Sequence, residues 1–136
     1  MRALAIDYGT KRCGIAVTDP NRLVAGRLPT VSTDEVLDWL KNYFQNEPVS
    51  DLVLGLPLRL DGSETHATAP VKKFAESVAN FFPDLKIHWI DERFTSKMAV
   101  QSMIQAGVPK KKRQEKGLID GMSAVILLQE FLEFHS

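Results

Sequence analysis

The fold of this chain is decided by residues 2–18, which read RALAIDYGTKRCGIAVT. Residues 2–7 and 13–18 are runs of small and branched apolar residues, and the segment between them is polar and contains a glycine. Two such runs joined by a short turn predict a β-hairpin. A second turn signal, Asp19-Pro20-Asn21, comes next and predicts a third, more exposed strand over residues 23–31. The chain is therefore expected to begin with three antiparallel strands.

Beyond these strands, helical and strand patterns alternate. The predicted elements are a helix capped by Thr33-Asp34, a strand over 51–56, a helix over 71–82, a strand over 86–90, a helix from 95 or 96 to 107, and a helix over 114–134. Three antiparallel strands followed by two helix–strand units predict an α/β fold. We expect a single domain, residues 1–136, with a mixed five-stranded sheet and helices on both faces, which is the layout of the ribonuclease H-like fold.

The composition is that of an ordinary globular protein. Of the 136 residues, 44% are hydrophobic and 25% are charged, so one substantial core is expected. The single cysteine, Cys13, has no partner for an internal disulfide, as is usual in a reducing compartment. No apolar run approaches the roughly 20 residues that span a bilayer. These features predict a cytoplasmic protein with no membrane partner.

The charges are balanced overall but not along the chain. The 17 basic and 17 acidic residues give a net charge of zero. Between residues 93 and 117, however, only Glu115 is acidic, against the basic residues Arg93, Lys97, Lys110, Lys111, Lys112, Arg113 and Lys116. A local basic excess of this kind would attract phosphate groups, although such runs are more often solvated loops.

Acidic residues lie where strands end. Asp7 ends an apolar strand that is predicted to be central, at the sheet edge where α/β folds place their sites. Its alternative role is that of a turn acid at the start of the hairpin. Asp91 and Glu92 end a later strand that should run parallel to the first. Because neighbouring side chains of a strand point to opposite faces, one of the two is expected to face Asp7, with Asp91 as the alternative to Glu92.

A third acid, Asp120, lies in the last predicted helix. At 100° per residue it shares a face with Ala124, Leu127 and Phe131, which should pack on the sheet. A buried carboxylate without a partner is costly, and a metal ion is one reason to retain it. The alternative is an acid of the first helical turn that interacts with the helix dipole.

Three carboxylates that meet at one sheet edge would repel one another unless cations lie between them. An all-oxygen donor set favours Mg²⁺ or Mn²⁺ over zinc. Two such ions could activate a water and stabilise the leaving oxygen of a phosphodiester. Asp7, Glu92 and Asp120 are therefore the predicted catalytic and metal-binding residues. His66, His88 and His135 show no ligand spacing and are interpreted as surface or packing residues.

Four segments, in order, closely resemble the YqgF (RuvX) family. They are AIDYGTKR at 5–12, VLGLPL at 53–58 followed by DGS at 61–63, DERFTS at 91–96, and ID at 119–120 followed by Ala124. The resemblance spans essentially the whole chain. It implies a ribonuclease H-like fold related to the RuvC Holliday junction resolvases, and a bacterial cytoplasmic nuclease that matures the 5′ end of pre-16S ribosomal RNA.

The resemblance also implies roles for individual residues. Asp7, Glu92 and Asp120 match the family's acidic site. In RuvC-type resolvases the second acid ends the strand equivalent to residues 51–56, whereas here that strand ends in Gly55-Leu56-Pro57 without a carboxylate. Arg12, Arg59 and Arg93 match the family's basic rim, and a guanidinium group suits bidentate phosphate contacts. The predicted nucleic-acid-binding residues are Lys11, Arg12, Arg59, Arg93, Lys110, Lys111, Lys112 and Arg113.

Several functions are compatible with these features. The first is a metal-dependent endonuclease that acts on structured nucleic acid, with pre-rRNA as substrate. The second is a resolvase that cuts branched DNA as a homodimer, since two strands must be cut symmetrically; a monomer and a homodimer both remain open. A third function is that of a nucleotide-binding module, in which Asp7-Tyr8-Gly9-Thr10 forms a phosphate loop. A further one is that of an RNA-binding assembly factor of low catalytic activity.

Overall fold

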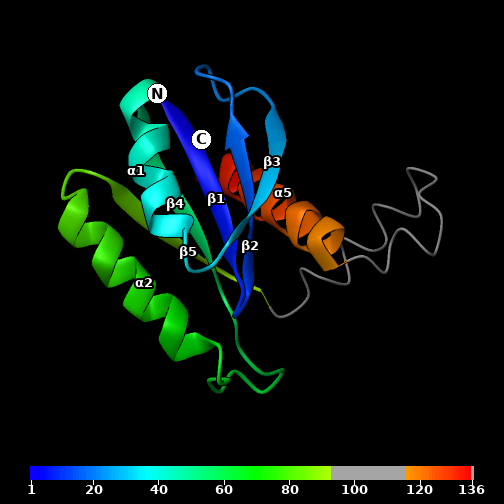
Figure 1. The fold of residues 1–136 in the computed structure, drawn as a ribbon. Coiled ribbons are helices and arrows are strands. Elements are labelled where there is room, and N and C mark those ends of the chain that lie inside the picture. The colour runs from blue at the N-terminus through cyan, green and yellow to red at the C-terminus, as the bar shows by residue number, and fades with distance from the viewer. Residues whose placement is uncertain (93–115, 136) are drawn as a thin grey trace.

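The computed structural model describes residues 1–92 and 116–135, with side chains described except at 116–122 and 134–135. Five strands form one sheet in the order β3-β2-β1-β4-β5 (Figure 1). The strands are β1 (Arg2–Tyr8), β2 (Arg12–Thr18), β3 (Ala25–Ser32), β4 (Val49–Leu56) and β5 (Lys86–Asp91), and the helices are α1 (Val36–Asn46), α2 (Thr68–Phe81) and α5 (Lys116–His135).

The strand directions confirm the predicted mixed sheet. β1, β2 and β3 pair antiparallel, while β4 is parallel to both β1 and β5. Each described element lies within a few residues of its predicted position. The helix predicted to end at residue 107 lies outside the described residues.

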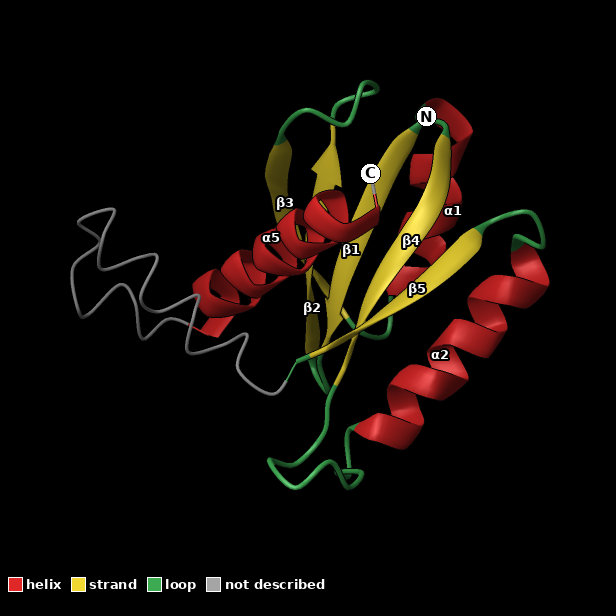
Figure 2. Cartoon of the chain, turned by 180° about the vertical axis from the view of Figure 1, so that it is seen from behind, coloured by secondary structure: helices red, strands yellow, loops and turns green. Residues whose placement is uncertain are grey.

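Strand alternation divides the core into two layers. Leu4 and Ile6 of β1 pack with side chains of α1 and α2 on one face of the sheet. Ala3 and Ala5 pack with α5 on the other face. Figures 1 and 2 show this arrangement, with α1 and α2 on one side and α5 crossing the opposite side. β1 is therefore buried on both faces, as a central strand should be.

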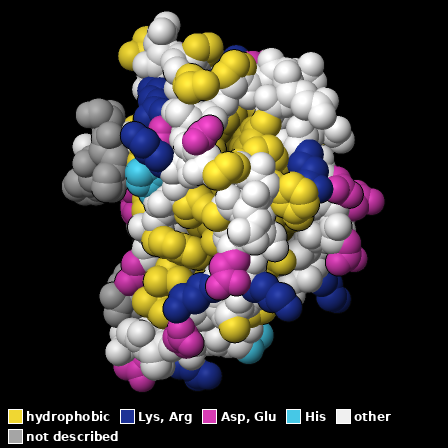
Figure 3. Space-filling view, turned by 90° about the vertical axis from the view of Figure 1, so that its left-hand side faces the viewer, with side chains coloured by type: hydrophobic (Ala, Val, Ile, Leu, Met, Phe, Trp, Pro, Cys, Tyr) yellow, Lys and Arg dark blue, Asp and Glu magenta, His cyan; other side chains and the backbone are white. Residues whose placement is uncertain are grey.

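The face that carries α1 and α2 is the one shown in Figure 3. Apolar side chains gather over its middle, and acidic and basic side chains border them. Part of this apolar surface is a shallow pocket of about 270 Å³ that Tyr8, Leu37 and Phe74 help to line. The ring of Tyr8 packs on that of Phe74, with 4.8 Å between the centroids.

The turn between β1 and β2 is tight. A Cβ atom at Gly9 would collide with the carbonyl oxygen of Arg12, so this turn requires a glycine. The hydroxyl of Thr33 donates a 2.7 Å hydrogen bond to the carbonyl of Gly9. The predicted cap of α1 by Thr33-Asp34 is therefore wrong: the helix begins at Val36, no side chain caps it, and Thr33 instead ties β3 to the first turn.

A polar cluster lies near the start of β4. Asp51, 7% exposed, accepts a 2.6 Å hydrogen bond from Ser50 and another from Arg22 of the β2–β3 turn. Its second oxygen is 2.8 Å from Nε2 of His88 on β5, whose ring packs on Phe131 of α5. Burial by itself would raise the pKa of Asp51, but these hydrogen bonds and the charge of Arg22 outweigh it and lower the pKa to about 2. His88 packs on Phe131, and it also contacts the Asp51 carboxylate, a role that the sequence did not predict.

Within residues 1–92 and 116–135, none of the helices is both long enough and apolar enough to cross a membrane.

Candidate active site

Asp7 is the penultimate residue of β1 and is half-buried. Because Ala3 and Ala5 belong to the α5 side of the core, alternation places Asp7 on that side as well. β1 runs parallel to β4 and β5, so their carboxyl ends lie at the same edge of the sheet. Asp7 therefore lies at the edge where α/β proteins place their functional residues.

Glu92 lies directly after β5 and is also half-buried. Its backbone N–H donates a 3.1 Å hydrogen bond to the carbonyl of Leu56, which continues the β4–β5 ladder by one step. Its side chain lies over Gly55, since the three atoms nearest to a Cβ built at Gly55 would all be side-chain atoms of Glu92. The Glu92 carboxyl group thus lies above β4, not above its own strand.

The register brings Asp7 and Glu92 to neighbouring positions. Ile6 of β1 pairs with Leu54 of β4, so the next residues along the two parallel strands are Asp7 and Gly55. Neighbouring strands lie about 4.8 Å apart. Both Asp7 and Gly55 follow residues of the α1 and α2 layer, and both therefore face α5. The Glu92 carboxyl group above Gly55 is one strand spacing from Asp7.

The register assigns Asp91 to the other face of β5, although its charge is near enough to α5 to act, after burial and Glu133, in raising the pKa of Glu130. Asp91 pairs with Leu56, whereas Ile90 pairs with Gly55 and packs in the α5 layer. Alternation therefore directs Asp91 away from the α5 side, and its side chain is exposed. This geometry favours Glu92 over Asp91 as the partner of Asp7.

Asp120 belongs to the N-terminal part of α5, and its side chain is outside the described part of the structure. The helix itself covers the side of the sheet that carries Asp7: Ala124, Leu127, Leu128 and Phe131 pack on the residues of this layer. The convergence of Asp120 with Asp7 and Glu92 stays a prediction.

Three of the predicted nucleic-acid-binding residues are described, and all three lie near the edge that carries Asp7. Lys11 is exposed in the β1–β2 turn, and Arg12 is the half-buried first residue of β2. Arg59 is exposed in the loop after β4, where its Nε donates to the carbonyl of Glu64 at 3.3 Å. The remaining five, Arg93 and Lys110 to Arg113, lie outside the described residues.

The possible metal ligands described at this edge of the sheet are carboxylate oxygens. Among the residues whose side chains are described, no group of three or more Asp, Glu, His or Cys is arranged to hold a metal ion. Asp7 and Glu92 supply two carboxylates, and a third would have to come from a side chain outside that set. Two adjacent carboxylates on one face are suited to a hard divalent cation such as Mg²⁺ or Mn²⁺.

Sequence reasoning missed the importance of Gly55 and the Asp51 cluster. From the sequence, Gly55 could be described only as part of a strand end without a carboxylate, because its contact with Glu92 depends on the fold. Asp51 begins an apolar run, and an acid at the start of a buried strand is a signal that a polar partner must be present. The partners themselves, Arg22 and His88, come from other elements, so sequence spacing could not identify them.

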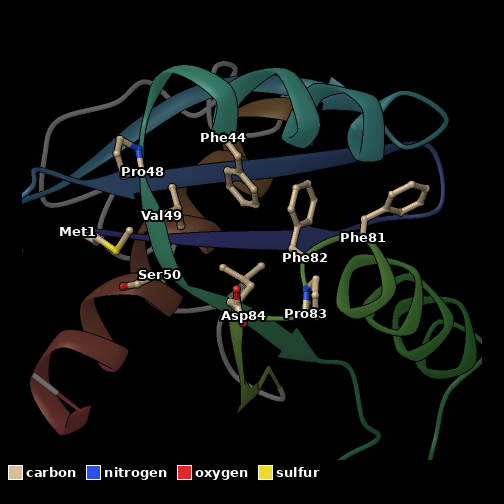
Figure 4. A pocket seen from close by; sticks show the side chains of 10 residues that line it. Met1, Phe44, Pro48, Val49, Ser50, Phe81, Phe82, Pro83 and Asp84 are labelled. Carbon is tan, nitrogen blue, oxygen red and sulfur yellow. The ribbon is translucent and has the colours of Figure 1, made fainter.

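An apolar pocket of about 550 Å³ lies elsewhere (Figure 4). Its lining includes Met1 and Val49, which are at the N-terminal ends of β1 and β4, together with Phe44 and Phe82. It is therefore at the opposite end of the strands from Asp7. Its lining includes one carboxylate, that of Asp84, so it does not offer the acid pair described above.

The strand order and the helices on both faces of the sheet define the ribonuclease H-like fold. Two solved structures share this fold. "T. thermophilus RuvC in complex with Holliday junction substrate" aligns with a TM-score of 0.60 at 14% identity, over 99% of this chain and 97% of that one. "Thermus thermophilus RuvC structure" aligns with a TM-score of 0.57 at 11% identity, over 100% and 98%.

The chain belongs to the RuvX family, whose model, described as "RuvX: Holliday junction resolvase", matches residues 1–134. A Porphyromonas gingivalis protein described as "Putative pre-16S rRNA nuclease" is 48% identical over 132 residues, which are 97% of this chain and 96% of the relative. A Flavobacterium johnsoniae protein of the same description is 47% identical over 131 residues, 96% and 95% of the two chains. The family predicted from the sequence motifs is confirmed.

Proposed function

We propose that this protein is a metal-dependent endonuclease that hydrolyses phosphodiester bonds in structured nucleic acid, and that its substrate is the 5′ end of the pre-16S ribosomal RNA. The observation that carries the proposal is the pair of carboxylates, Asp7 and Glu92, on one face of the sheet edge. The names of the relatives, which describe pre-16S rRNA nucleases, supply the substrate.

Asp7, Glu92 and Asp120 would hold Mg²⁺ or Mn²⁺, with two ions expected. When bound, such ions supply Lewis-acid activation of the phosphodiester and of the water that attacks it. Asp7, at the end of the central strand, would be the central ligand of the three. Glu92 approaches from above β4, and α5 would bring Asp120 from the layer above the sheet.

The basic residues around this edge would hold the substrate backbone. Lys11 and Arg12 follow β1, and Arg59 follows β4, so their charges border the carboxylates on the strand-end side. Phosphate contacts of this kind position a nucleic acid without reading its sequence. Recognition by backbone shape and charge therefore suits a folded RNA precursor.

A second candidate substrate is a four-way DNA junction. It is favoured by the description of the family model that matches residues 1–134. A junction also presents a shaped backbone, so the same basic rim would serve it. The two substrates differ in the 2′-hydroxyl and in the symmetry of the cut, which a junction resolvase makes on two strands.

The two candidates are distinguished by one assay. The purified protein is incubated with Mg²⁺ or Mn²⁺ and, in parallel, with a pre-16S precursor RNA and a four-way DNA junction of equal length. We expect metal-dependent cleavage of the RNA near the mature 5′ end, and no symmetrical nicks in the junction. Binding of the RNA without cleavage of either substrate in either metal would reject the nuclease in favour of an assembly factor.

A further inference from the structure

Gly55 is the penultimate residue of β4 and has no side chain where its neighbours across the sheet carry theirs. A Cβ atom at this position would overlap the carboxyl carbon, Cγ and Oε1 of Glu92. No backbone atom and no other side chain is among these three nearest atoms. Glu92 therefore fills the space directly above Gly55, with its three atoms within 2.5 Å of the Cβ position.

The path of the Glu92 side chain explains why this space matters. Glu92 is anchored at the end of β5 by the hydrogen bond from its N–H to the carbonyl of Leu56. From there its carboxyl group extends across β4 toward β1, whose residue beside Gly55 is Asp7. Any side chain at position 55 would stand between the β5 anchor and Asp7.

We infer that Gly55 is a positioning residue, whose missing side chain lets Glu92 place its carboxylate where an acid borne by β4 itself would lie. β4 ends in Gly55-Leu56 without a carboxylate, and the neighbouring strand supplies one at that position. The inference deepens the proposed function, because it concerns how one ligand of the proposed metal site is held.

The packing part of the inference is tested without metal, by thermal unfolding of four proteins: wild type, Gly55→Ala, Glu92→Ala and the double variant. Alanine in place of a strand glycine is otherwise neutral or stabilising. We expect Gly55→Ala alone to lower the melting temperature only slightly, because the overlapping atoms are the end of a flexible side chain that can rotate away at the cost of its present contacts. In the Glu92→Ala background the same substitution should cost nothing, because the overlapping carboxyl group is gone.

The matched control is Gly26→Ala in β3. A Cβ atom there would lie 3.8 Å from the carbonyl oxygen of Val17, an ordinary contact, so the melting temperature should not fall. If Gly55→Ala is equally harmful with Glu or Ala at position 92, including failure to fold in both backgrounds, the inference is overturned.

The functional part is tested by titrating each protein with Mn²⁺ alone and measuring its affinity calorimetrically. Gly55→Ala should weaken Mn²⁺ binding by about tenfold or more, as expected for a displaced ligand. Gly26→Ala should bind like the wild type. Unchanged Mn²⁺ affinity in Gly55→Ala would overturn the positioning role. Absence of Mn²⁺ binding by the wild type would instead count against the proposed function. The metal-free melts would still show whether the effect of Gly55→Ala depends on the Glu92 side chain.

Discussion

Asp7 carries a charge at the end of a strand whose preceding four residues are completely buried. A half-buried carboxylate at such a position calls for a cation or a hydrogen-bond donor that offsets its burial. Glu92 on the same side of the sheet cannot fill that role, because it is also an acid. The two acids together therefore define a place that favours a divalent cation, and each can be tested by removing its charge while its shape is kept.

Asp7→Asn is the sharpest test at this position. The amide has nearly the same volume, so the melting temperature should stay within a few degrees of the wild type. Cleavage of the precursor RNA should fall by about 100-fold or more, since the amide lacks the negative charge that would hold the ions. Asp38→Asn, at an exposed position of α1, is the control and should cleave normally. Full activity of Asp7→Asn would remove Asp7 from the catalytic site.

Asp51 has a different role, because its charge is satisfied within the fold by Ser50, Arg22 and His88. Its pKa of about 2 in the folded protein is below the value of about 4 of an unfolded chain. Folding therefore favours the ionised form, and the stabilisation is complete above pH 4. It is lost as the pH falls from about 4 to 2.

The expected size of this pH effect is roughly 2 kcal/mol. Urea unfolding of the wild type and of Asp51→Asn should show a difference in unfolding free energy at pH 7 that shrinks by about this amount at pH 2. A gap between wild type and Asp51→Asn that is independent of pH would contradict the assignment of the low pKa to Asp51.

Helices and strands were predictable because their apolar periods are clear. β1 and β4 are short buried runs, and α2 repeats apolar residues on one face. The details that failed depend on contacts between distant segments. The Thr33 hydroxyl bonds to Gly9 instead of capping α1, and alternation alone could not say whether Asp91 or Glu92 faces Asp7. That choice depends on the β4–β5 register, which pairs Gly55 with Ile90.

α5 is the element on which the third ligand depends. If Asp120 binds metal, the metal-free protein holds three carboxylates together, and their repulsion opposes folding. Asp120→Asn should then leave the metal-free melting temperature unchanged or raise it. Addition of Mn²⁺ should raise the melting temperature of the wild type more than that of the variant, because only the bound state is stabilised.

A structural role for Asp120 makes the opposite prediction. An acid that only interacts with the helix dipole would lose a few tenths of a kcal/mol on conversion to Asn, with intact cleavage. Equal Mn²⁺-induced shifts in both proteins, together with normal cleavage, would therefore exclude Asp120 from the metal site and leave Asp7 and Glu92 as a two-carboxylate site.

The protein as a whole has no net charge, so its attraction for a polyanion must come from an uneven distribution. Three of the described basic residues, Lys11, Arg12 and Arg59, lie at the end of the sheet that carries Asp7. The sequence places four more in succession at Lys110 to Arg113, outside the described residues. This uneven distribution predicts binding that depends strongly on salt.

Replacement of Lys110, Lys111, Lys112 and Arg113 by Ala should weaken RNA binding and flatten its dependence on salt. If all four contact phosphates, the slope of log K against log salt concentration should decrease in magnitude by about 3. The cleavage rate at saturating RNA should be unchanged, since these residues are assigned to binding. Replacing Lys72 and Lys73 on α2 is the control. A slope equal to that of the wild type would show that the segment is only a solvated connector.

The position of β1 between β2 and β4 has a consequence for synthesis on the ribosome. β2 follows β1 almost at once, but β4 begins about forty residues later. At translation rates of about 5–20 residues per second, one edge of β1 waits roughly 2–8 s for its partner. During that interval the apolar run from Ala3 to Ile6 has an unpaired edge that could join another nascent chain. Synonymous codons that slow translation between residues 19 and 48 should therefore increase aggregation, although the finished protein is identical.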